Sequence, residues 1–259
     1  MGTSASSKGP GAGVSFDPPW LDDIDVPGQE NQNNNVNPAI GIAPKARFGN
    51  ARRSMGEYVR SGSKDSVRRS LGHYSKTGMG GAQNVARRMR TSTKTASNFF
   101  NTFRSLRDDT TFSLGKEISE LKNRGAIDAI VSHICPNGGS IDEVSCRDSG
   151  TSALSEFMDQ NPDADFGNLS DDQIWSLTAI YLGNEAFNRI QMDIGQAFEK
   201  QDVPYVERVT RLNDMREYIQ SEIAIQMDAL RKTADQNVDM NQLFQDTIKN
   251  TFEVFEVEV

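Results

Sequence analysis

The fold is decided by residues 170–198, SDDQIWSLTAIYLGNEAFNRIQMDIGQAF. Ser170 followed by Gln173 forms a capping-box pattern, in which each side chain bonds a backbone N–H at the start of a helix. Apolar residues then return every three or four positions, the spacing of one helix face. They are Ile174, Leu177, Ile180, Tyr181, Phe187, Ile190, Ile194 and Phe198. This stretch therefore predicts a long helix that begins at Ser170.

The next apolar run supplies a partner for that helix. Pro204 favours a helix start, because its fixed φ suits the first turn. The run that follows repeats every three or four residues and comprises Val206, Val209, Leu212, Ile219, Ile223, Met227 and Leu230. Two such helices pack as an antiparallel hairpin, which we expect to form the core. The predicted class is all-α: an irregular helical bundle with a long C-terminal helical hairpin, preceded by a disordered N-terminal tail.

Shorter helices are expected on both sides of the hairpin. Apolar spacing predicts them over residues 48–59, 63–74 with Ser63 as cap, 82–107, 114–123, 127–134, from about 140, and 240–255. The last residues alternate with acids, so a terminal strand is the alternative there. Gly78, Gly80 and Gly81 precede one helix as in a phosphate loop, but no strand comes before them and no Gly-Lys-Ser/Thr follows. A plain turn is favoured.

Charge divides the chain into three parts. Residues 1–44 carry one Lys against five acids, residues 45–107 carry fifteen Lys and Arg against two acids, and residues 108–259 carry twelve against twenty-nine. The chain's net charge is −8. We predict a flexible tail over 1–44, a basic helical segment over 45–107 and an acidic helical body over 108–259. The basic segment faces either the acidic body or an anionic partner outside the chain.

Composition argues against several kinds of site. The chain has two cysteines, Cys135 and Cys146, and two histidines, His73 and His133. This inventory makes a disulfide framework and a structural zinc site improbable, so no metal and no cofactor are expected. His133 and Cys135 are expected in the core. No catalytic constellation emerges, and the chain is predicted not to be an enzyme. Without a long apolar run or a signal sequence, it is expected to be cytoplasmic and not in a membrane.

The basic segment is the first candidate site. Its expected docking patch comprises Arg68, Arg69, His73, Arg87, Arg88 and Arg90. Arginines of this density suit phosphate backbones, yet no recognition motif accompanies them. The patch therefore predicts docking to nucleic acid or to a partner protein.

The N-terminus is the second candidate site. Met1 followed by Gly2 favours removal of the initiator methionine, which exposes an α-amine with a reference pKa of about 7.7 to 8.0. A flexible tail of this length has a root-mean-square reach of roughly 35 to 40 Å, so the amine could enter another protein's active site. Trp20 lies among acids and either docks to a partner or packs on the chain's own body. The start also fits a myristoylation pattern, although one acyl chain without a basic cluster anchors poorly.

Several motifs along the chain are idiosyncratic. They are Met1 to Ser4, Gly9-Pro10, Pro18-Pro19-Trp20, Leu71-Gly72-His73-Tyr74, Ala86-Arg87-Arg88-Met89 and Cys135-Pro136-Asn137-Gly138-Gly139. With them the chain resembles, almost end to end, the QatB family, the accessory proteins of the bacterial Qat anti-phage system. The resemblance implies three partners: a QueC-like enzyme, a KAP-type P-loop ATPase and a TatD-like metal nuclease.

The resemblance also implies a role for the N-terminus. QueC-like enzymes use ATP to activate a deazapurine carboxylate, and related defence proteins suggest that an N-terminal glycine can replace ammonia as the acceptor. Gly2 would then receive a 7-deazaguanine group, with Thr3, Ser4 and Trp20 recognised in the cleft of the enzyme. The alternative is a structural adaptor whose basic helices bind nucleic acid or the partner ATPase or nuclease.

Overall fold

The computed structural model describes residues 43, 45–109, 111–121, 123–135, 138–199, 202–233, 238–257 and 259. All regular structure within these ranges is helical, so the predicted all-α class is confirmed. Gly2, Thr3, Ser4 and Trp20 lie outside the described residues. No helix among the described residues is long and apolar enough to cross a bilayer.

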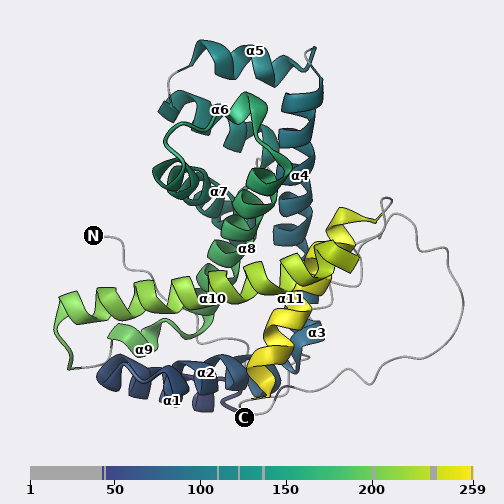
Figure 1. The fold of residues 1–259 in the computed structure, drawn as a ribbon. Coiled ribbons are helices and arrows are strands. Elements are labelled where there is room, and N and C mark those ends of the chain that lie inside the picture. Colours follow the sequence, from purple (N-terminus) through teal and green to yellow (C-terminus); the bar gives the residue numbers. More distant parts are fainter. Residues whose placement is uncertain are drawn as a thin grey trace, which may run out of the picture.

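The described ranges contain α-helices, one π-helical turn and one 3-10 turn (Figure 1). In chain order they are α1 (Gly49–Ser61), α2 (Lys64–His73), the π turn (Tyr74–Met79), α3 (Ala82–Arg88), α4 (Arg90–Asp108), α5 (Ser113–Glu120), α6 (Asn123–Ile134), α7 (Ile141–Gln160), the 3-10 turn (Phe166–Asn168), α8 (Asp171–Ile194), α9 (Gln196–Glu199), α10 (Tyr205–Thr233) and α11 (Met240–Glu256). The C-terminal segment is therefore helical and not a strand.

Helix α8 runs through the middle of the molecule (Figure 1). Its predicted capping box is confirmed, because Ser170 Oγ accepts the N–H of Gln173 and Gln173 Oε1 accepts the N–H of Ser170. Helices α4, α7 and α10 all pack against it. It therefore buries residues on every side, including the unbroken run from Leu177 to Phe187.

The predicted antiparallel pairing of α8 with α10 is confirmed. Asp172 at the start of α8 meets Arg231 near the end of α10, Gly183 approaches Gln220, and Phe187 lies under Arg216. The apolar face of α10 is shorter than predicted, however. Its buried residues are Met215, Ile219, Ile223 and Met227, whereas Val206 is 73% exposed. The core therefore centres on α8, with α10 laid across it.

The helix predicted over 82–107 is interrupted at Met89. The N–H of Met89 is shared between the carbonyls of Val85 and Ala86, and its ψ of 19° leaves the helical range. Hydroxyl residues follow, and Thr93 Oγ1 donates to the carbonyl of Arg90; such bonds compete with the helical ladder. The interruption lets α3 pack against α11 while α4 packs against α8.

Two local expectations are wrong. Ser63 occupies the N-cap position of α2, but its side chain makes no cap hydrogen bond. His133 is exposed and packs edge-on against Phe112, whereas Cys135 is buried as expected. At the start of α2, the Ser63 hydroxyl accepts no N–H of the first turn, and the backbone N–H of Ser63 donates to Ser61 Oγ. The exposure of His133 follows from the α6 face, which buries Ile130, Val131 and Ile134 and turns residue 133 to solvent.

One hydrophobic cluster joins the basic segment to the acidic body. Tyr58 of α1 packs edge-on against Phe198 of α9, and α11 packs against α2, α3 and α4. At the start of the described chain, Phe48 stacks on Tyr74 with ring centroids 5.6 Å apart. At its end, Lys76 Nζ donates to the backbone oxygen of Val259 at 2.7 Å. Residues 48 and 259 thus both attach to the segment from Gly72 to Lys76.

Candidate functional site

Three of the predicted docking residues share helix α2. Arg68 lies over the ring of Tyr218 at 5.9 Å, and Arg69 forms an ion pair of 3.5 Å with Glu57, in which both side chains are largely exposed. The pKa of His73 is lowered, first by burial and then by the positive charges of Arg69 and Lys76. These effects favour the neutral form of His73, so the positive charge of this face comes mainly from its neighbours.

The other three predicted docking residues lie on two further helices. Arg87 and Arg88 end α3, Arg90 begins α4, and all three are half-buried. The six residues thus come from three helices, α2, α3 and α4. Helix α11 packs against all three. The docking role of the six residues stays a prediction.

Part of the basic segment faces the acidic body. Arg107 Nη1 pairs with Asp171 Oδ1 at 2.8 Å, and Arg52 Nη2 donates to the backbone oxygen of Asp193 at 2.8 Å. Both contacts join residues far apart in sequence, and the ion pair of Arg107 with Asp171 partly compensates the charge segregation. Of the two alternatives from the sequence, packing against the chain's own body applies to these arginines.

A buried carboxylate, Glu185, lies where α4, α7 and α8 meet, and the sequence did not predict it. Its Oε2 accepts Ser92 Oγ at 2.5 Å, and its Oε1 accepts Ser145 Oγ at 2.9 Å and Ser149 Oγ at 2.6 Å. Cys146 Sγ adds a contact of 3.5 Å to Oε2. A carboxylate whose oxygens are filled by hydroxyl donors tolerates burial. In the sequence, Ser145 and Ser149 stand four residues apart and therefore share one face of α7. This spacing indicates a polar face, but it does not indicate that Glu185 is the acceptor.

The two thiols are shielded within this region. Burial, together with the charge of Glu185, raises the pKa of Cys135 to about 12 and that of Cys146 to about 12. A nucleophilic cysteine needs a lowered pKa, because the thiolate is the reactive form. These thiols therefore act as packing and hydrogen-bonding groups. Among the described residues no three His, Cys, Asp or Glu side chains are placed to hold a metal ion.

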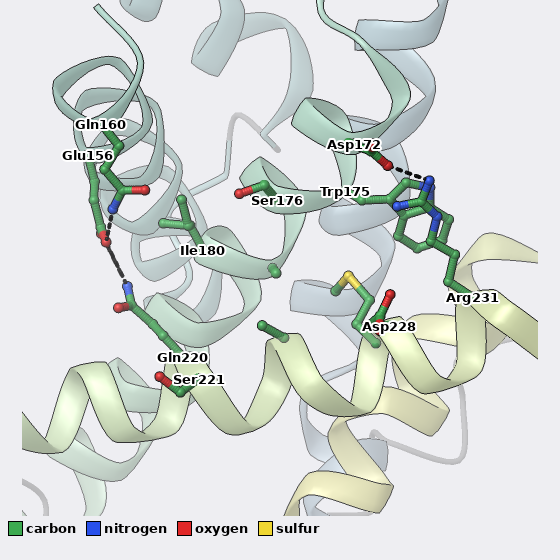
Figure 2. Close-up of a pocket in the computed structure, with 13 residues that line it drawn as sticks. Glu156, Gln160, Asp172, Trp175, Ser176, Ile180, Gln220, Ser221, Asp228 and Arg231 are labelled. Atoms are coloured by element: carbon green, nitrogen blue, oxygen red, sulfur yellow. Dashed lines mark hydrogen bonds and ion pairs between the residues drawn. The ribbon is translucent and has the colours of Figure 1, made fainter.

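A groove of about 370 Å³ opens between α7, α8 and α10 (Figure 2). Trp175 lines one end, where Arg231 lies over its ring at 5.3 Å and pairs with Asp172 at 2.7 Å. At the other end, Gln220 Nε2 donates to Glu156 Oε2 at 3.1 Å. The polar groups labelled at both ends thus bond to one another across the helices. These bonds stabilise the α8–α10 crossing, and the groove between them is open to solvent.

Comparison with known families gives the chain its context. The family model described as Qat anti-phage system associated protein QatB matches residues 80–255. The chain belongs to the QatB family. The match runs from the glycine turn before α3 almost to the end of α11, and thus covers the central helix and the Glu185 centre. No curated protein and no solved structure matches the chain. Membership of the QatB family makes the chain an accessory component of the Qat anti-phage system.

Proposed function

We propose that this QatB-family chain is a protein substrate whose Gly2 α-amine is conjugated to a 7-deazaguanine group by a QueC-like partner. The observation that carries the proposal is the start Met1-Gly2-Thr3-Ser4 in a member of this family. Removal of Met1 leaves an amine without a side chain on its Cα. An active-site cleft built to approach the backbone closely admits glycine more readily than any other residue.

The proposed reaction is acyl transfer to nitrogen. The partner would activate the deazapurine carboxylate with ATP as an acyl adenylate, and the Gly2 amine would attack its carbonyl carbon. An amide C–N bond forms, the C–O bond to AMP breaks, and the amine loses one proton to a base in the partner or to water. The α-amine suits this step, since with a pKa of about 7.7 to 8.0 part of it is neutral at cellular pH.

The described part of the chain supplies the anchor for this segment. Ala43, Arg47 and Phe48 are buried, so the chain enters the body at a fixed place. The residues before it span at most about 150 Å when fully extended, which is enough to reach into a partner protein. Thr3, Ser4 and Trp20 are proposed as the residues that the cleft recognises.

Intact mass after co-expression with the other Qat proteins tests the conjugation. The expected result is a mass increase equal to the deazapurine carboxylic acid minus one water, located on the N-terminal peptide. Gly2→Leu, which retains Met1, is expected to abolish both the added mass and protection against phage. Gly11→Val, a matched change further along the same segment, is expected to leave both intact. An unmodified N-terminus in a chain that still protects would refute the proposal.

A second candidate function is the adaptor. It is favoured by Arg68, Arg69 and His73 sharing one helix, with Arg69 half exposed. In this role the basic helices would dock nucleic acid, the KAP-type ATPase or the TatD-like nuclease. Charge reversal at Arg87, Arg88 and Arg90 is then expected to abolish salt-sensitive DNA binding, while deletion of residues 2–42 leaves it unchanged. Filter binding at two salt concentrations separates the two functions.

A further inference from the structure

A second arginine cluster, centred on Arg47, was not predicted from the sequence. Arg47 lies just before α1 and Arg52 lies within it, and their guanidinium carbons are 4.6 and 5.8 Å from the same Phe48 ring centroid. The charges of Arg88 on α3 and Arg189 on α8 both act on Arg47. Three helices and the turn before α1 thus bring arginine side chains to one place.

Arg47 is an exception to the usual rule for buried charges. The residue is only 5% exposed, yet none of its three guanidinium nitrogens has a hydrogen-bond partner within the described chain. Its contact with the face of Phe48 stabilises the cation only modestly. Burying an unpaired guanidinium is costly. The buried guanidinium of Arg47, whose N–H groups have no acceptor among the described residues, points to a bound anion that those residues do not supply.

The nearby carboxylates are already engaged. Arg189 Nη1 pairs with Asp142 at 2.7 Å, and its Nε lies 3.8 Å from Asp193 Oδ2. Tyr74 donates its hydroxyl to the same Asp193 oxygen at 2.8 Å. Arg52 bonds the neutral backbone oxygen of Asp193 and no carboxylate, and its Nε is unpaired within the described residues. The charge of Asp193 also acts favourably on Arg47. Because Asp193 is shared with Arg189 and Tyr74, it does not balance the charges of both Arg47 and Arg52.

We propose that Arg47 and Arg52 bind a dianionic phosphoryl group of a small molecule. Two guanidinium groups beside one shared carboxylate suit a phosphomonoester, whose charge is about −1.5 to −2 at pH 7. The planar fork of arginine also fits phosphate oxygens in a bidentate manner. Arg52, Arg88 and Asp193 are half-buried, so the surroundings of Arg47 are not closed off completely from solvent.

The lowered pKa of Arg47 agrees with a missing anion. Burial is the largest cause of the shift, and the charge of Arg88 comes next. A bound dianion opposes both effects. The residues named for this site all belong to the described part of the chain, and none of them is used in the proposed conjugation.

Calorimetric titration of the full chain with inorganic phosphate and, separately, with AMP tests the site. Binding by either probe is expected, and the tighter one tells whether free phosphate or a nucleotide monoester is the source. Arg47→Met is expected to raise the dissociation constant by about tenfold or more. Arg53→Met, which removes an exposed charge from the neighbouring helix α1, serves as the matched control and is expected to leave binding unchanged.

Thermal unfolding gives an independent readout, because a ligand that binds only the native state raises the midpoint. Potassium phosphate is expected to raise it above that in potassium chloride of equal ionic strength by more for the parent chain and for Arg53→Met than for Arg47→Met, since the general stabilisation by phosphate is common to all three. Arg52→Met provides the same comparison if Arg47→Met does not fold. The proposal is overturned if neither probe binds, if Arg47→Met and Arg53→Met behave alike, or if only an oligonucleotide without a terminal phosphate binds.

Discussion

Glu185 has the most demanding environment of any single side chain described above. Three serine hydroxyls and a thiol point at its two oxygens, so an amide in its place would set an NH₂ group against donors. Glu185→Gln is expected to lower the free energy of unfolding by about 2 to 4 kcal/mol, because buried donors lose a charged acceptor. Urea denaturation measures the loss.

Glu156→Gln is the matched control for that experiment. Glu156 accepts from Gln220 in the solvent-open groove (Figure 2), where water replaces a lost bond, so a loss below about 1 kcal/mol is expected. If both variants lose the same free energy of unfolding, the buried hydrogen bonds of Glu185 contribute no more to stability than the exposed ones of Glu156.

At the residue scale, the sequence indicated which residue types suit a core or a docking surface, but not which side chains surround each of them in the fold. The burial of Cys135 follows from its apolar neighbours, but His133 has the same neighbours and is exposed. The Arg47 cluster unites Arg47, Arg52 and Arg189, and the last is more than a hundred residues from the others. No local pattern reports such a meeting, because it depends on how α1, α3 and α8 pack.

Helix ends offer a comparison within one molecule at the element scale. Ser170 accepts the Gln173 N–H at the start of α8, whereas Ser63 holds the same position before α2 without a cap bond. Ser170→Ala is expected to lower the free energy of unfolding by about 1 kcal/mol. Ser63→Ala is expected to change it by no more than a few tenths of a kcal/mol. Guanidinium denaturation of the two variants decides, and indistinguishable midpoints would contradict the assignment.

Element positions were largely predictable because apolar spacing and caps are local signals. The start of α8, the α8–α10 pairing and the helical C-terminal segment follow from them. The break at Met89 does not, since it contains neither glycine nor proline, and α3 and α4 both pack against α11 while α4 also packs against α8. Val206 repeats the apolar spacing of α10 but lies beyond the reach of the core.

Alkaline pH is the condition that tests the whole molecule. Burial raises the pKa of Cys135 and of Cys146 from 9.0 to about 12, and burial also raises that of Tyr58 from 10.0 to about 12. Below pH 9 the folded and unfolded chains hold these protons equally. Between pH 9 and pH 12 the unfolded chain loses them first, so the free energy of unfolding is expected to fall as pH rises.

Urea titrations at pH 8 and pH 10 measure this loss. Cys135→Ala removes one of the three groups and is expected to show a smaller loss between the two pH values than the parent chain. An identical pH dependence would show that the Cys135 proton is not coupled to folding. At pH 8 the native thiols are also expected to resist alkylation, since the thiolate is the reactive form.

At the scale of the whole molecule, the fold class and family were within reach of the sequence and the site was not. Family membership rests on residues 80–255, whereas the proposed acceptor Gly2 lies before that range. The charge segregation was visible in the composition, but only packing distinguishes arginines that pair with the body, such as Arg107, from those that do not, such as Arg47.

Phe48 and Val259 both contact the short segment from Gly72 to Lys76. A donor fluorophore fused after Val259 would therefore lie near Phe48, at the start of the helical body. Because both native thiols are buried, an acceptor dye can be directed to a single introduced cysteine, Ser15→Cys. If a partner enzyme binds the N-terminal segment in its cleft, the distance between the two dyes is expected to increase and the energy transfer to fall. The labelled protein would then report binding of this segment directly.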